Sequence, residues 1–206
     1  MFLDKYKLVI FDWDGTLSTS TSLVNVSRFM KLRYGVKDIE RRKSVYASET
    51  AENAKRDESM NRIYAFLYDL YSLFYRPRLK DGVLDLLMDL KKDGKKVAIF
   101  SDSNQYRLES ETKALGIRGK VDMIMSADTI KKFKPNPAGL LMIAKKFKVD
   151  KSECIYLGDM VVDIYTARFA GIDSCAIADG IDPYSLLKRM KPDYLAKSIS
   201  ELPKLR

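Results

Sequence analysis

The sequence contains no histidine among its 206 residues, and it has only two cysteines, Cys154 and Cys175. The lack of histidine excludes Ser-His-Asp and Cys-His catalysis, and it also excludes metal sites built on imidazole. Two cysteines in unrelated parts of the chain exclude a disulfide scaffold and a cysteine-built zinc site. Any metal is therefore expected among oxygen ligands, which favours a hard cation such as Mg²⁺.

No apolar run in the chain approaches the about 18 residues that a membrane-spanning helix needs. The apolar run near the N-terminus, within residues 7–12, is too short and too soon followed by acidic residues for a signal peptide. The composition is 46% apolar and 32% charged, as in globular proteins. We therefore expect a cytoplasmic protein with no membrane partner, built as one large domain or one domain plus an insertion.

Positive charge exceeds negative charge, and its distribution is uneven. The formal net charge is +9, and residues 18–80 hold +6 of it, from 13 Lys and Arg against 7 Asp and Glu. A basic surface is compatible with nucleic acid, with a small anionic substrate, or with solubility alone. Because nothing but charge points to nucleic acid, we do not expect it as a partner.

Five short apolar runs are rich in β-branched and aromatic residues, which is typical of strands buried on both faces of a parallel sheet. They lie at residues 7–12, 96–101, 121–126, 153–159 and 173–179. Stretches of helical period separate several of them, at 81–94, 105–116 and 136–148. Alternating strands and helices predict an α/β fold with a Rossmann-like parallel sheet.

One interval breaks this alternation, because about 80 residues separate the first strand from the second. Residues 22–34, 37–58 and 61–75 have helical patterns and contain no strand-like run. We therefore predict two domains. Residues 1–17 and 78–206 form the α/β core, and residues 18–77 form an inserted helical cap domain.

The last helix predicted in the insertion is apolar almost all round, which is typical of a helix that is buried or packed on a partner. Tyrosines recur on one of its faces, at Tyr64, Tyr68, Tyr71 and Tyr75. Packing between helices accounts for this stripe, and the alternative is that one or two hydroxyls face a substrate. Such a helix could also support self-association, so a monomer and a homodimer both remain open.

Carboxylates follow the first and fourth predicted strands. Asp12 and Asp14 lie in DWDGTL, and Asp159 and Asp163 lie in GDMVVD. Ligands bind at the carboxyl ends of parallel strands. Carboxylates gathered there need a cation, or some of them must stay protonated. The alternatives are a hairpin turn at Asp14-Gly15 and ordinary placement of Asp163 in a first helical turn.

A lysine and a serine complete the predicted site. Lys134 lies in KPNP, where Pro135 restricts its surroundings, and Ser101 ends the second predicted strand. An ammonium beside carboxylates would neutralise charge and bind a phosphoryl oxygen, and Ser101 would offer a hydroxyl to the same group. A solvated basic loop and an ordinary helix cap are the respective alternatives.

These four motifs, in this order, resemble the signatures of the haloacid dehalogenase superfamily of aspartyl phosphotransferases. The resemblance implies a sheet of order 3-2-1-4-5. It also implies that the inserted helices are a cap similar to that of the phosphoglycolate phosphatase-like branch. In this sequence Ser18-Thr19-Ser20 stands where an acidic residue often follows DGTL in that branch.

The resemblance also implies a role for each motif residue. Asp12 would attack phosphorus to form an aspartyl-phosphate, and Asp14 would protonate the leaving oxygen and later deprotonate water. Mg²⁺ would bind the Asp12 carboxylate, the Asp14 backbone carbonyl and Asp159, with Asp163 direct or through water. The phosphoryl oxygens would contact Ser101, the backbone N–H of Asp102 and Lys134.

We therefore expect a Mg²⁺-dependent phosphatase acting on a small phosphomonoester, either phosphoglycolate-like or a sugar phosphate. A phosphomutase of the same family and a non-catalytic regulator that keeps the fold are the alternatives. Basic residues of the predicted cap, including Arg28, Arg33 and Arg41, suit a substrate with negative charge beyond its phosphate. Solvation of the outer cap is the other interpretation of these side chains.

Overall fold

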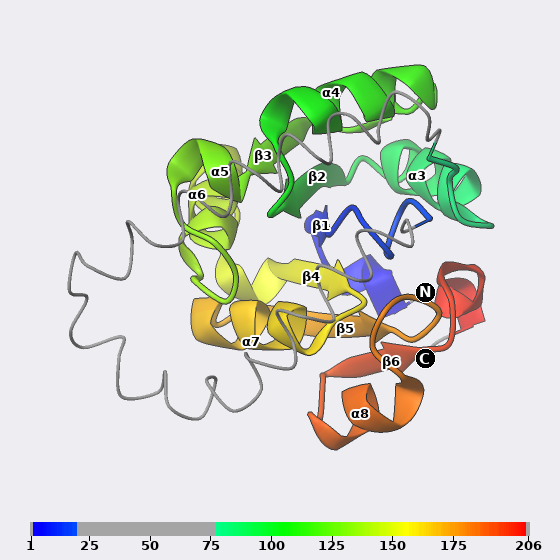
Figure 1. Ribbon diagram of the computed structural model, residues 1–206, viewed down its shortest axis with the longest axis vertical. Coiled ribbons are helices and arrows are strands. Elements are labelled where there is room, and N and C mark those ends of the chain that lie inside the picture. The colour runs from blue at the N-terminus through cyan, green and yellow to red at the C-terminus, as the bar shows by residue number, and fades with distance from the viewer. Residues whose placement is uncertain (1, 20–76, 205–206) are drawn as a thin grey trace, which may run out of the picture. The chain divides into compact units, whose positions relative to one another are not determined.

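All five apolar runs form parallel strands of one sheet in a computed structural model, which describes residues 2–19 and 77–204 (Figure 1). The strands are β1 (Leu8–Phe11), β2 (Lys96–Ser101), β3 (Met123–Ser126), β4 (Cys154–Gly158) and β5 (Asp173–Ile177). Their order is β3-β2-β1-β4-β5, as the family resemblance implies, and the short strand β6 (Tyr194–Ala196) extends the sheet beside β5.

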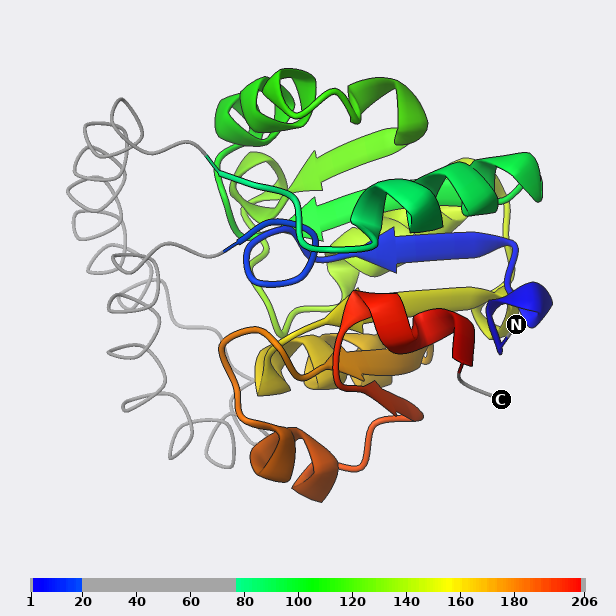
Figure 2. The same ribbon diagram turned by 90° about the vertical axis from the view of Figure 1, so that its right-hand side faces the viewer.

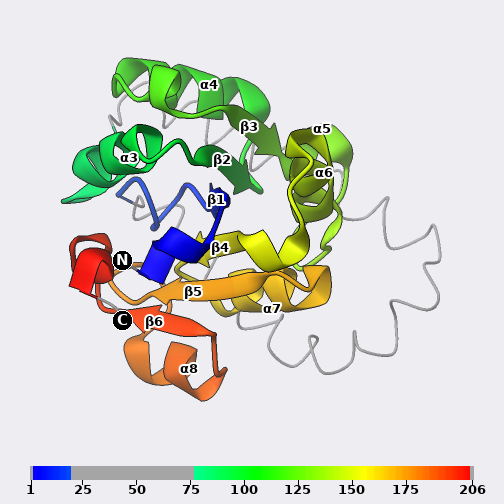
Figure 3. The same cartoon turned by 180° about the vertical axis from the view of Figure 1, so that it is seen from behind.

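Helices cover both faces of this sheet. The longer ones are α3 (Val83–Lys92), α4 (Gln105–Ala114), α6 (Ala138–Phe147) and α7 (Val161–Ala170). The shorter helices are α5 (Ala127–Ile130) and α8 (Tyr184–Arg189), with 3₁₀ turns η1 (Phe2–Lys5), η2 (Arg118–Lys120), η3 (Lys151–Glu153) and η4 (Ile199–Lys204). Helices α3 and α4 lie on one side of the sheet and α6 and α7 on the other (Figure 3). The described part of the chain is thus a three-layer α/β fold.

The core alternates along each strand. In β1, Val9 and Phe11 belong to the cluster that contains Leu87 of α3. Leu8 and Ile10 belong to the opposite cluster, which contains residues of α6 and α7. Burial of each such side chain contributes about 1.5–3 kcal/mol, so the run LVIF is stabilised from both faces.

The register brings the carboxyl ends of the central strands to one edge. Phe11 of β1 pairs with Ile99 of β2 and with Leu157 of β4. The strand arrows in Figure 2 accordingly point to the same edge, where the loop after β1 also lies. Residues that directly follow β1, β2 and β4 therefore meet there.

The chain leaves and re-enters this unit at adjacent positions. Ser18 forms an antiparallel bridge with Leu79, and the Thr19 N–H donates to the Arg78 carbonyl at 2.8 Å. Met1–Thr19 and Pro77–Arg206 form one compact unit. The helices and the tyrosine stripe predicted between residues 22 and 75 lie outside the described residues, so the cap domain and its boundaries stay a prediction. None of the helices in the described ranges is long and apolar enough to cross a membrane.

Candidate active site

The loop after β1 turns sharply and keeps its two aspartates at the sheet edge. The Asp12 N–H donates to the Leu157 carbonyl at 2.8 Å, which ties the loop to β4. Gly15 has φ of 81°, a left-handed conformation that glycine adopts without strain. Because β1 pairs only with parallel strands in the described sheet, the hairpin alternative for Asp14-Gly15 is wrong.

Asp159, directly after β4, is fixed by two other segments of the chain. The Thr16 hydroxyl donates to its Oδ1 at 3.0 Å, and the Ile181 N–H donates to its Oδ2 at 2.7 Å. Gly15 and Gly180 approach it so closely that a Cβ on either would lie 2.3 or 2.2 Å, respectively, from Oδ2. Both glycines are therefore needed to admit this carboxylate.

Asp163 lies in the first turn of α7, where its carboxylate accepts a backbone N–H at the helix start and also contacts Tyr156 and Lys134. Its Oδ2 accepts the Met160 N–H at 3.0 Å, as expected of an acidic residue near a helix start. Its Oδ1 accepts from the Tyr156 hydroxyl at 3.1 Å and from Lys134 Nζ at 2.8 Å. The two interpretations of Asp163 are thus compatible.

Three buried carboxylates come together at this edge. Asp12, Asp159 and Asp163 each offer an oxygen, and these oxygens all lie within 4.8 Å of one another. Oxygen donors of this kind suit a hard divalent cation such as Mg²⁺. Glycines in place of larger residues leave the carboxylates room to converge. The donor set therefore fits the cation that the sequence predicts.

Lys134 supplies the positive charge at the cluster. Its Nζ lies 2.7 Å from Asp12 Oδ1 and 2.8 Å from Asp163 Oδ1, and its side chain is 3% exposed. Burial acts to lower the pKa of Lys134, but the carboxylates of Asp12, Asp163 and Asp102 outweigh it and raise that pKa above its ordinary value. Lys134 is therefore a fixed ammonium, and the solvated-loop alternative is wrong.

The end of β2 adds the remaining predicted groups. Ser101 is fully buried, and its Oγ accepts the Ser103 N–H at 3.2 Å. Asp102 Oδ1 accepts the Lys134 N–H at 3.1 Å, which couples this strand end to the lysine loop. Asn104, not Ser101, caps α4, so the helix-cap alternative for Ser101 is wrong.

Asp14 points its carboxylate toward α4, unlike the three clustered aspartates. Its Oδ1 accepts from Arg107 Nη2 at 2.5 Å, and its Oδ2 accepts from Arg107 Nη1 at 3.1 Å and from the Ser103 hydroxyl at 2.6 Å. Asp14 is 1% exposed. Asp128, in the short helix α5 that follows β3, pairs with Lys131 at 2.9 Å.

Several residues of this site carry no recognisable signal in the sequence. Tyr156 lies within a strand and looks like a core residue, yet its hydroxyl reaches Asp163. Burial, followed by the charges of Asp163 and Asp12, raises the pKa of Tyr156 well above its ordinary value, so the phenol keeps its proton. Arg107 and Glu111 have the i,i+4 spacing of an ordinary surface pair.

The family described as haloacid dehalogenase-like hydrolase matches residues 9–177 of the chain. The chain is 25% identical over 203 residues to a protein named pyrophosphatase PpaX from Bacillus velezensis, covering 94% of this chain and 93% of that protein. It is 29% identical over 187 residues to a protein named phosphoglycolate phosphatase from Xanthomonas campestris pv. campestris, covering 82% of each.

Solved structures agree with this assignment. A chain described as a haloacid dehalogenase-like hydrolase from Bacteroides fragilis superposes with a TM-score of 0.75 at 25% identity, covering 96% of this chain and 99% of that one. A hydrolase from Pseudomonas syringae gives a TM-score of 0.72 at 23% identity, covering 96% of each chain. Because the sequence identity to the Pseudomonas syringae hydrolase is only 23%, this similarity shows a shared fold and nothing more.

Proposed function

The chain belongs to the haloacid dehalogenase-like hydrolase family, and on that premise we propose that it is a Mg²⁺-dependent phosphatase of small phosphomonoesters. One observation carries the proposal. Three buried carboxylates, those of Asp12, Asp159 and Asp163, converge within 4.8 Å at the carboxyl edge of the sheet, and the Lys134 ammonium lies between two of them. Such an arrangement suits a highly charged phosphoryl group.

Asp12 is the proposed nucleophile. Its carboxylate oxygen forms a bond to phosphorus while the bond from phosphorus to the leaving oxygen breaks. Asp14, which must take up a proton before this step, gives that proton to the leaving oxygen and so makes the leaving group an alcohol. Water then attacks phosphorus, the bond to Asp12 breaks, and Asp14 takes the proton. The products are the alcohol and inorganic phosphate, and both aspartates return to their starting state.

The proposed metal ligands are the carboxylates of Asp12, Asp159 and Asp163 and the backbone carbonyl of Asp14. When bound, Mg²⁺ would neutralise negative charge on the phosphoryl group. Thr16 and the Ile181 N–H hold the Asp159 carboxylate in place. The Met160 N–H and the Tyr156 hydroxyl do the same for Asp163. These donors orient the ligand oxygens before any ion arrives.

The phosphoryl oxygens are proposed to contact Lys134, the Ser101 hydroxyl and the backbone N–H of Asp102. Lys134 already lies 2.7 Å from the proposed nucleophile. The Lys134 N–H donates to Asp102 Oδ1 at 3.1 Å, so the end of β2 and the loop that carries Lys134 are fixed to each other. Fixed donors of this kind stabilise charge in the transition state without reorganisation.

The proposed substrate carries a second negative group beside its phosphate ester. The two relatives named above are called a pyrophosphatase and a phosphoglycolate phosphatase. The second name implies a phosphate ester that also bears a carboxylate, and the first implies an anhydride in which a second phosphate supplies the extra negative charge. The excess of basic residues between positions 18 and 80 supports the same class, because a basic field attracts anions.

A panel of phosphorylated metabolites assayed for released inorganic phosphate, with and without Mg²⁺, tests this function. We expect release with Mg²⁺ from at least one ester that bears a carboxylate or a second phosphate, and no release by the Asp12→Asn variant. A phosphomutase would return an isomerised sugar phosphate in place of inorganic phosphate. Absence of turnover on every ester would contradict the proposal.

A further inference from the structure

Arg107 grips the carboxylate of Asp14 with both ends of its guanidinium. Nη2 lies 2.5 Å from Oδ1 and Nη1 lies 3.1 Å from Oδ2, and the side chains are 9% and 2% exposed. A bidentate pair fixes the plane of a carboxylate as well as its distance. Arg107 therefore determines which way the Asp14 side chain points.

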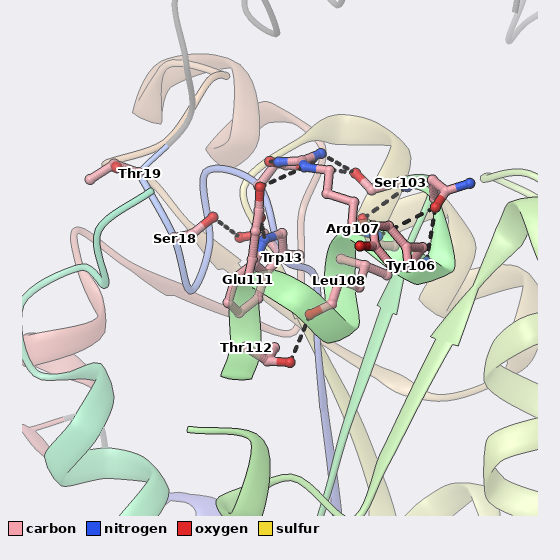
Figure 4. A network of polar contacts seen from close by, with 12 residues as sticks. Trp13, Ser18, Thr19, Ser103, Tyr106, Arg107, Leu108, Glu111 and Thr112 are labelled. Atoms are coloured by element: carbon pink, nitrogen blue, oxygen red, sulfur yellow. Dashed lines mark hydrogen bonds and ion pairs between the residues drawn. The ribbon is translucent and has the colours of Figure 1, made fainter. Parts of the chain in front are cut away.

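Arg107 is in turn held in place by Glu111, which also binds Trp13 (Figure 4). Its Nε donates to Glu111 Oε1 at 2.8 Å, and Glu111 Oε2 accepts the indole N–H of Trp13 at 2.6 Å. Trp13 precedes Asp14 in the chain, so the contacts form a closed ring that begins and ends in the loop after β1. The Ser103 hydroxyl closes the ring on its other side, between Arg107 Nη1 and Asp14 Oδ2.

The members of this ring depend on one another. Removing one partner from a buried charge pair leaves an uncompensated charge, and a buried polar network that is fully satisfied is rigid. A lysine could replace the charge of Arg107 but could not make the fork to Asp14 and the Nε contact to Glu111 at the same time. The geometry, more than the charge, is therefore what arginine provides.

We propose that Arg107 is a positioning residue for Asp14, and that Glu111 and Trp13 set the position of Arg107. The inference rests on the proposed function, in which Asp14 serves the leaving group and Asp12 attacks phosphorus. Loss of Arg107 should then affect the step that Asp14 serves and spare the attack by Asp12. This differs from a general loss of stability, which would reduce every reaction alike.

The test compares Arg107→Met with wild type on alkyl phosphates and on activated aryl phosphates, whose leaving groups need little protonation. A displaced catalytic group costs roughly a hundredfold, so we expect kcat/KM to fall about that much on alkyl esters and only a few-fold on aryl esters. In an Asp14→Asn background, Arg107→Met should cost almost nothing more. Equal losses on both ester classes, or losses that multiply in the double variant, would overturn the inference.

Two further variants keep the test decisive. Ser103→Ala removes one donor to Asp14 without leaving a buried charge. We expect its kcat/KM to fall more on alkyl esters than on aryl esters, as for Arg107→Met but by a smaller factor. This variant keeps the inference testable even if Arg107→Met does not fold. The matched control is Arg118→Met, which breaks a half-exposed ion pair of 2.5 Å between Arg118 of η2 and Glu109 of α4, the helix that also carries Arg107. We expect unchanged kinetics for the control.

Fluorescence gives a readout that needs no activity. The chain has one tryptophan, and its indole donates to Glu111 within the ring. We expect Ser103→Ala and Arg107→Met to shift Trp13 emission while Arg118→Met does not. If no ester is hydrolysed, the proposed function fails but the emission shift still reports the ring. If the Trp13 emission is unchanged in both ring variants, the inference is overturned. The proposed function is tested separately, by the phosphatase assay.

Discussion

The backbone at Gly180 lies against the carboxylate of Asp159, so that a Cβ at position 180 would be 2.2 Å from Asp159 Oδ2. The next residue, Ile181, donates its N–H to the same oxygen at 2.7 Å. The loop after β5 thus both makes room for a proposed metal ligand and fixes its orientation. This relationship gives the first prediction.

Gly180→Ala is expected to weaken metal binding while the fold remains. The added methyl group must displace the Asp159 carboxylate, and we expect the Mg²⁺ concentration for half-maximal activity to rise at least about tenfold, since metal ligands tolerate little displacement. The control is Gly119→Ala, where nothing lies within 4 Å of the added Cβ. A Mg²⁺ requirement that is equal in the two variants would contradict this part of the account.

Removal of the metal is expected to abolish activity, and Mg²⁺ to restore it. Asp159→Ala should weaken Mg²⁺ binding more than Asp163→Ala does, because Asp163 also bonds Lys134 and Tyr156 and could act through water. Titration of Mg²⁺ against initial rate checks both statements. Full activity in chelator, or a preference for Zn²⁺, would count against an all-oxygen site.

Stability is expected to fall in alkaline solution. Burial raises the pKa of Cys154 from 9.0 to about 11, and burial also raises the pKa of Cys175. A pKa raised by folding stabilises the protein fully below the unfolded value, and that contribution is lost as the pH rises toward the folded value. The free energy of unfolding should therefore decline above about pH 9, and less steeply in Cys154→Ala. Equal slopes for variant and wild type would show that this thiol plays no part.

The sequence predicted the central sheet well because each of the five runs is buried on both faces, which leaves a continuous apolar pattern. The parallel arrangement then brings Asp12, Ser101 and Asp159 to one edge of the sheet, and the strand order that makes their strands neighbours came from the family resemblance. The strand β6 (Tyr194–Ala196) was not predicted, since it has three residues and lies partly exposed at the sheet edge. Short edge strands carry too little pattern to be recognised.

The ring around Asp14 could not be predicted for a different reason. Arg107 and Glu111 lie four apart on α4, and that spacing is equally typical of a solvated surface pair. Their burial follows from the packing of α4 against the loop after β1, which is a tertiary contact. By contrast, the sequence distinguishes Lys134 from Lys131 and Lys132 through the adjacent Pro135, and the fold buries Lys134 beside Asp12 while the other two lysines are exposed.

Salt dependence tests the role of the basic residues between positions 18 and 80, whose structure lies outside the described ranges. If they attract substrate, esters with a second negative group should have higher kcat/KM than neutral alkyl or aryl phosphates at low ionic strength. That advantage should shrink as salt is added, because screening shortens the range of the field. Comparable efficiency for the two classes at low salt would assign these side chains to solvation.

The most direct test of the central claim is detection of a phosphoryl group on Asp12. The protein is mixed with Mg²⁺ and an activated aryl phosphate, quenched in acid, digested and analysed by mass spectrometry. We predict phosphorylation of the peptide that contains Asp12, more of it in Asp14→Asn, where water is no longer deprotonated, and none in Asp12→Asn, which should also be inactive. Turnover by Asp12→Asn at even about a tenth of the wild-type rate, where loss of a nucleophile costs far more, would contradict the account.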